Sequence, residues 1–170
     1  MPKNTVESPK PSTASQFMQV VRSPLRLKLF FLKNMPMGFI AGLRVPHADA
    51  DETEVTISMG YLTKNPFRSI YFACQAMAAE LSTGILAINA IEKSSQKFSV
   101  IVVGIEAEFT KKAVGKITFK CTDGPEFKAT IDKCLESNEP HTYTATSIGH
   151  NEMDEKVAEF KITWSFKPKD

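Results

Sequence analysis

Glu80 is the residue whose surroundings in the sequence point most directly to chemistry. It is the only charged residue between Arg68 and Glu92, in a stretch built from Ala, Ile, Leu, Met and small polar residues. An isolated carboxylate in apolar surroundings is costly unless it is paired, hydrogen-bonded or protonated. Such a group is suited to act as a general base on water or as a nucleophile. The structural alternative is a carboxylate exposed at a subunit groove, or satisfied by Asn65, a serine or a backbone N–H.

Two polar residues are candidates to assist Glu80. Asn65 lies fifteen residues before it and could orient a water or a substrate carbonyl. Asn before Pro66 is equally typical of a loop residue that caps a turn. Thr83 lies about one helical turn after Glu80 and could line the same pocket, although a hydroxyl bonded back to its own helix is more common. For Asn65 and for Thr83, the sequence alone does not decide between the functional and the structural interpretation.

The sequence predicts no metal site and no redox cofactor. The three cysteines are widely spaced and form no Cys-x-x-Cys pair, and the three histidines share no spacing with one another or with acidic residues. Zinc sites require closely spaced cysteine and histidine ligands. The cysteines are therefore expected to be free thiols in a reducing, cytoplasmic compartment.

Composition favours one soluble domain and excludes a dedicated nucleic-acid binder. The chain has 170 residues, of which 42% are hydrophobic, and a net charge of +2 from 21 basic and 19 acidic residues. Binding to nucleic acid requires a strongly basic face. The apolar segment 70–91 is long enough to span a membrane, but it contains Glu80, and a carboxylate at mid-bilayer costs about 2.5–3.5 kcal/mol. A membrane span is therefore rejected in favour of a buried helix.

The elements that must position these residues follow from the hydrophobic pattern. Residues 15–34 read as two helices, 38–60 as a strand pair, and the apolar segment around Glu80 as one long helix. Four strands follow, with a short amphipathic helix inserted before the last two. This order predicts an α+β fold in which a twisted antiparallel sheet wraps around the long helix. Residues 1–14 are expected to be a flexible leader, and residues 15–170 a single domain with a helical extension at 15–34.

The start of the long helix resembles that of hot-dog fold thioesterases of the phenylacetate-pathway type. Those proteins carry an Asn, then His-Gly-Gly where the helix begins, then an Asp or Glu further along. Asn65 matches the Asn, and Glu80 falls where the catalytic carboxylate falls. The segment EAEFTKKAVGKITFKC resembles their strand pair, and the element order agrees over roughly residues 38–167. Hot-dog relatives of undefined function, whose helix begins with aromatic residues, are closer still.

The helix start also departs from that family pattern. Tyr71, Phe72 and Ala73 stand where the family has His-Gly-Gly, and Arg68 stands at the family's Gly between the Asn and the His. In the family, the backbone N–H at this point polarises the thioester carbonyl, with the helix dipole favouring the developing charge. The bulk of Tyr71 and Phe72 is expected to narrow or re-aim the site. Both side chains are expected to fill the place where a small acyl or aryl group would otherwise enter.

The resemblance implies an acyl-CoA thioesterase with Glu80 as the catalytic residue, assisted by Asn65. Arg68, with Lys111 and Lys112, is a candidate for contacts to the coenzyme A phosphates, although solvated surface charges are the plainer interpretation. The family places its active sites across a subunit boundary, so a homodimer or tetramer is expected, without nucleic acid or membrane. The alternative is a non-catalytic hot-dog protein that binds an acyl chain or acyl thioester without cleaving it.

Overall fold

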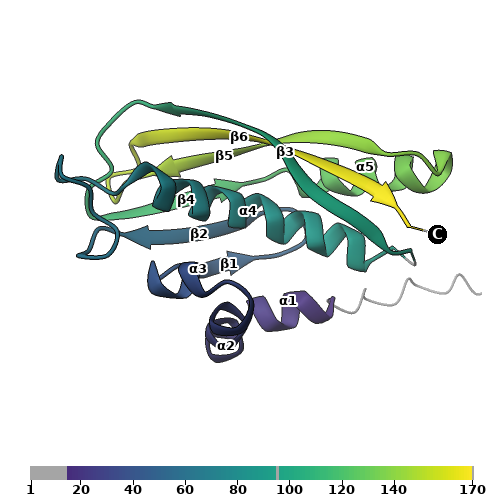
Figure 1. The fold of residues 1–170 in the computed structure, drawn as a ribbon, viewed down its shortest axis with the longest axis horizontal. Helices are drawn as coiled ribbons and strands as arrows, with labels where there is room; N and C mark the ends of the chain where they lie inside the picture. Colours follow the sequence, from purple (N-terminus) through teal and green to yellow (C-terminus); the bar gives the residue numbers. More distant parts are fainter. Residues whose placement is uncertain (1–14, 95, 170) are drawn as a thin grey trace, which may run out of the picture.

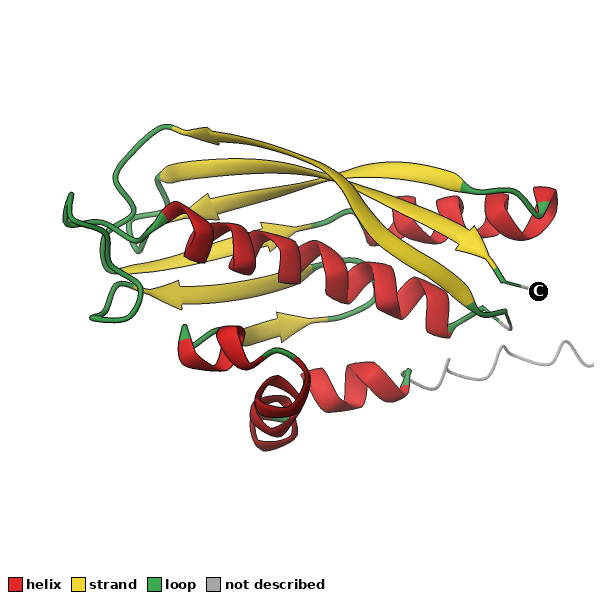
Figure 2. Cartoon of the chain, viewed as in Figure 1, coloured by secondary structure: helices red, strands yellow, loops and turns green. Residues whose placement is uncertain are grey.

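The computed structural model describes residues 15–94 and 96–169, and the expected leader at 1–14 lies outside these ranges. The fold is α+β, as the pattern predicts, with one long helix packed against a curved antiparallel sheet (Figures 1 and 2). The helices are α1 (Gln16–Val21), α2 (Pro24–Asn34), α3 (Pro36–Ile40), α4 (Phe72–Glu92) and α5 (Gly124–Ser137). The strands are β1 (Arg44–Ala48), β2 (Thr53–Ser58), β3 (Phe98–Phe109), β4 (Lys116–Cys121), β5 (His141–His150) and β6 (Lys156–Pro168). Their order in the sheet is β1-β2-β4-β5-β6-β3.

Helix α4 is the core helix. Its buried positions are mostly small, including Ala78, Ala79, Ser82 and Gly84, which lets the strands approach closely. By length and composition α4 could cross a membrane, but 72% of its most apolar window is buried inside the protein. The helix is therefore apolar because the sheet and the N-terminal helices cover it, as the sequence predicts.

Of the N-terminal helices, α1 packs beneath the second half of α4 (Figure 1). The Ser15 hydroxyl caps α1 by accepting from the Met18 N–H, and it also donates to Asn89 Oδ1 at 3.1 Å. Phe31 of α2 is buried in the core, whereas Leu25 and Leu29 are exposed on the opposite side of α2. The extension thus belongs to the core of the domain on one face only.

The first strand is shorter than the sequence pattern suggests. Residues expected to begin a strand at 38 instead complete the short helix α3, and β1 begins only at Arg44. Pro36 supplies the fixed φ that suits the first turn of a helix. Gly42, with a φ of +72°, then reverses the chain toward the sheet.

Strand β3 forms one edge of the sheet and pairs only with β6 among the described strands. Its apolar side chains remain largely in contact with solvent: Ile101, Val103 and Ile105 are 62%, 57% and 54% exposed. A long, apolar, unpaired edge is prone to pair with another strand, and soluble proteins normally shield such edges. The β3 edge is therefore open to pairing with another strand.

Candidate functional site

The carboxylate of Glu80 lies in an apolar environment with no partner. The described part of the chain offers it no hydrogen bond or ion pair, and its lining neighbours include Leu81, Ile88 and Trp164. Burial raises the pKa of the Glu80 carboxyl above its ordinary value of 4.5. No cation or hydrogen-bond donor offsets this desolvation, so the satisfied structural carboxylate considered from the sequence is not what the described residues form.

A helical glycine leaves room beside this carboxylate. A Cβ added at Gly84 would lie 3.6 Å from Glu80 Oε1 and 3.4 Å from Cη2 of the Trp164 ring. The absence of a side chain at this position therefore keeps open the space between the carboxylate and the indole.

Thr83 is buried and bonded within the protein. Its hydroxyl donates to the backbone carbonyl of Glu80 at 2.9 Å and accepts from Trp164 Nε1 at 3.0 Å. Thr83 lines neither the cavity at the start of α4 nor the one beside Glu80. It therefore holds the indole against the helix, and a direct contact of Thr83 with a substrate stays a prediction.

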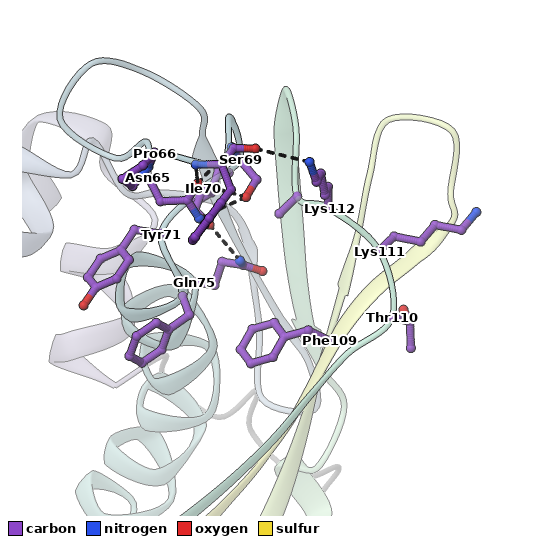
Figure 3. A pocket seen from close by; sticks show the side chains of 13 residues that line it. Asn65, Pro66, Ser69, Ile70, Tyr71, Gln75, Phe109, Thr110, Lys111 and Lys112 are labelled. Atoms are coloured by element: carbon purple, nitrogen blue, oxygen red, sulfur yellow. Dashed lines mark hydrogen bonds between the residues drawn. The ribbon is translucent and has the colours of Figure 1, made fainter.

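Asn65 organises the loop that leads into α4. Its side-chain Oδ1 accepts from the N–H groups of Phe67 and Ser69, at 2.9 and 3.2 Å, and its Nδ2 donates to Ser69 Oγ at 3.0 Å. These contacts are those of the turn-capping interpretation. Asn65 also lines a cavity of about 640 Å³ at the start of α4 (Figure 3).

Arg68 keeps the backbone conformation that a glycine would favour. Its φ is +60°, within the left-handed region, and its side chain is exposed. A glycine is what the resemblance to the hot-dog thioesterases places at this position, and a positive φ suits glycine better than arginine. Arg68 does not line the cavity at the start of α4, and its contact with a phosphate stays a prediction.

Replacing Arg68 with glycine should stabilise the protein. The left-handed conformation costs a non-glycine residue roughly 1–2 kcal/mol, and glycine offsets part of this gain through the entropy of the unfolded chain. We expect a net gain of about 0.5–1 kcal/mol in the free energy of unfolding, seen as a rise in Tm of about 2 °C. Arg68→Ala keeps the strain and should give no rise. An equal gain from alanine would show that the arginine side chain, rather than the backbone, is unfavourable.

The helix start presents two backbone donors next to two aromatic residues. Within the described part of the chain, the N–H groups of Phe72 and Ala73 have no acceptor, as is normal for a first helical turn. The rings of Tyr71 and Phe72 are half exposed and pack edge to face at 4.8 Å. The first turn of α4 therefore offers two free N–H donors next to two aromatic side chains.

Gln75 is a polar residue of this cavity that sequence reasoning did not select. It is 5% exposed, and its Nε2 donates to the Ile70 carbonyl at 3.1 Å (Figure 3). Its Oε1 is the one buried side-chain oxygen or nitrogen without a partner among the described residues. The available signal was a glutamine within an apolar helix.

The predicted site residues fall into two separate places along α4. Asn65, Tyr71 and Phe72 line the cavity at the helix start, whereas Glu80 lines the second cavity beside Trp164, and the two cavities share no residue. Phe72 and Glu80 are eight residues apart, which is about 12 Å along a helix. One thioester carbonyl cannot be within hydrogen-bond reach of both in a single protomer.

The sheet that wraps around a long central helix defines the hot-dog fold, and known structures of that fold match the chain. A Pseudomonas aeruginosa protein of unknown function, described as a probable thioesterase, is 20% identical with a TM-score of 0.73 and covers 86% of this chain and 97% of its own. A Haemophilus influenzae thioesterase is 15% identical, with a TM-score of 0.62 and coverage of 86% and 91%. A Staphylococcus aureus thioesterase, solved with a glutamine replaced by alanine, is 13% identical, with a TM-score of 0.61 and coverage of 79% and 100%.

A protein family also matches the chain by its amino-acid sequence. The family described as "Domain of unknown function (DUF4442)" matches residues 26–166. The chain therefore belongs to this family, and the hot-dog fold expected from its helix start is confirmed. None of the curated protein sequences compared with the chain matches it significantly.

Proposed function

We propose that the protein is a cytoplasmic thioesterase that hydrolyses acyl-CoA or a related thioester, with Glu80 as general base or nucleophile. The observation that carries the proposal is the half-buried, unpartnered Glu80 carboxylate beside an apolar cavity. The protein leaves this carboxylate desolvated and uncompensated, as is common at catalytic sites. The three free, buried cysteines agree with a reducing compartment.

A complete site on this proposal forms between two protomers. The helix start supplies the free N–H groups of Phe72 and Ala73, and the second half-site is Glu80 of the other copy. The separation of about 12 Å along α4 supports a site shared by two chains. The apolar, unpaired edge of β3 offers the surface through which a second copy can continue the sheet.

The relatives add support that is independent of the cavity. The S. aureus protein was solved both with a glutamine replaced by alanine and with a glutamate, fifteen positions further on, replaced by alanine. Asn65 and Glu80 have the same separation in this chain. An amide side chain followed by a carboxylate at that interval is therefore a pattern that the two proteins share.

A non-catalytic binding protein is the second candidate, and the helix start is the observation that favours it. The half-exposed rings of Tyr71 and Phe72 lie next to the free N–H groups of Phe72 and Ala73 in the chain, and Phe72 stands where the resemblance expects a glycine. If those rings keep the carbonyl away from the N–H groups, the thioester would be bound and not cleaved. Asn65, whose side chain is hydrogen-bonded within its own loop, would then only maintain the shape of the site.

A hydrolysis screen separates the two functions. We expect the wild-type protein to release free thiol from at least one of a panel of short-chain, long-chain and aryl CoA thioesters, measured with a thiol-reactive dye. Binding of a thioester without thiol release would decide for the binding protein. In that case the triple variant Tyr71→His, Phe72→Gly, Ala73→Gly restores the family triplet and should gain hydrolysis, if the rings are what suppresses it.

A further inference from the structure

The cavity beside Glu80 is an apolar chamber with one charged group. Its volume is about 240 Å³, and Glu80 is the only charged residue among those that line it. Three surfaces contribute: the N-terminal helices through Phe17, Phe30 and Met35; α4 through Leu81, Gly84, Ala87, Ile88 and Ile91; and the sheet through Val100 and Trp164. The N-terminal extension thus forms one wall of the chamber that the carboxylate faces.

Gly84 indicates that this space serves a ligand and is not a packing defect. Glycine inside a helix is less stable than alanine, and α4 otherwise uses alanine freely at its close contacts. A methyl group at Gly84 would stand 3.6 Å from the Glu80 carboxylate and 3.4 Å from the indole, in ordinary to tight contact. The position could therefore hold an alanine at the expense of the space next to the carboxylate.

The lining determines what such a ligand must be. No side chain that lines the chamber carries a positive charge, so an acyl group ending in a carboxylate would meet only the repulsion of Glu80. Small-molecule sites usually measure about 300–1,000 Å³, and this one lies below that range. The chamber therefore suits a short, uncharged alkyl chain or a single unsubstituted ring.

We propose that this chamber holds the acyl group of the thioester, and that the N-terminal helices, through Phe30 and Met35, set the acyl length that fits. The inference rests on the proposed function, because it places the acyl group next to the proposed base. It assigns to the extension a role in substrate selection in addition to its role in the core.

Trp164 allows the acyl group to be detected without any hydrolysis. It is the only tryptophan of the chain and lines the chamber. The probes are CoA thioethers with ethyl, butyl, octyl and carboxypropyl tails, which cannot be hydrolysed. We expect the short alkyl thioethers to change the fluorescence of Trp164, and free CoA and the carboxypropyl thioether to leave it unchanged at the same concentrations.

Variants at Met35 test the role of the extension. Met35 is only partly buried, so its replacement should leave the fold intact. Met35→Ala should shift the preferred tail to a longer one, with about a fourfold gain in affinity for each methylene newly buried. Met35→Phe should shift the preference to a shorter tail. Gly84→Ala should weaken every alkyl thioether. Leu32→Ala, on the exposed side of α2, is the matched control and should change nothing.

The outcomes distinguish this inference from the proposed function. An unchanged tail preference in both Met35 variants would overturn the inference, even if the protein hydrolyses thioesters. A Trp164 response that follows tail length in a protein that cleaves no thioester would overturn the proposed function and leave the chamber as an acyl-binding site. A response to free CoA equal to that of the thioethers would also overturn the inference, because the indole would then be reporting on the carrier.

Discussion

Replacing Glu80 with glutamine should lower kcat for thioester hydrolysis by about 10²- to 10⁴-fold, the contribution of a general base. The change keeps the size of the side chain and removes only its ability to accept a proton. Wild type and variant are compared at saturating substrate by thiol release, on whichever thioester the screen identifies. Glu136→Gln, an exposed position on α5, is the matched control and should retain full activity. A Glu80→Gln protein that keeps wild-type kcat would show that Glu80 is not the base.

The same substitution should raise the stability of the protein at neutral pH. Burial raises the pKa of folded Glu80 above 4.5, so the folded state binds more protons than the unfolded state between the two pKa values. Stability contributed by Glu80 therefore falls as pH rises through that window, and glutamine removes the loss. Urea unfolding at neutral pH should show the gain, and it should disappear below about pH 4.5. The wild-type activity should also fall as the pH is lowered. The fall should begin above pH 4.5, because the raised pKa of Glu80 means that the base becomes protonated there.

Charging the exposed edge of β3 should produce the second large effect. In the double variant Ile101→Lys, Val103→Lys, two apolar side chains that are 62% and 57% exposed become cations on an unpaired strand. Lysine on an edge strand opposes pairing with a second copy. We expect a dimer in wild type and a monomer in the variant by sedimentation at micromolar concentration. Hydrolysis should fall at least about 10²-fold, because the N–H donors of the partner's helix start are lost.

The matched control places the same two charges on another exposed apolar surface. Leu25 and Leu29 of α2 are 70% and 59% exposed, and their replacement with lysine should leave both assembly and activity unchanged. A wild-type monomer that hydrolyses thioesters would contradict the shared site. Dissociation by the α2 variant alone would place the interface on the N-terminal helices. Circular dichroism confirms that each variant is folded before it is compared.

Local patterns in the sequence were sufficient to predict most of the helices and strands. The alternation of Phe160, Ile162, Trp164 and Phe166 predicts a strand with one buried face, and these residues are 1%, 0%, 8% and 0% exposed. Ser15 and Pro24 stand where two helices begin, and such starts can be read locally because capping and proline geometry depend on adjacent residues. The first strand was predicted too long because an apolar run such as GFIAGL suits a short helix as well as a strand.

The candidate site could be predicted only in part from local sequence patterns. Glu80 stands out in the sequence because one charge in an apolar helix is unusual wherever the chain folds. Its lack of partners depends on Phe30, Met35 and Trp164, which are distant from it in sequence, so only the tertiary structure could decide it. Gln75 has a hydrogen-bond partner on Nε2 and none on Oε1 among the described residues. No rule of residue spacing could have predicted this difference.

The residues themselves thus determined which side chains can do chemistry, and packing decided which of them meet. Asn65 and Glu80 match a family pattern, yet within one protomer the fold directs them to separate cavities. The reason is the rise of the helix, which separates the first turn from Glu80 by about 12 Å. The left-handed backbone conformation of Arg68 could not be predicted from the sequence either. A positive φ at a non-glycine residue is imposed by the hydrogen bonds of its loop.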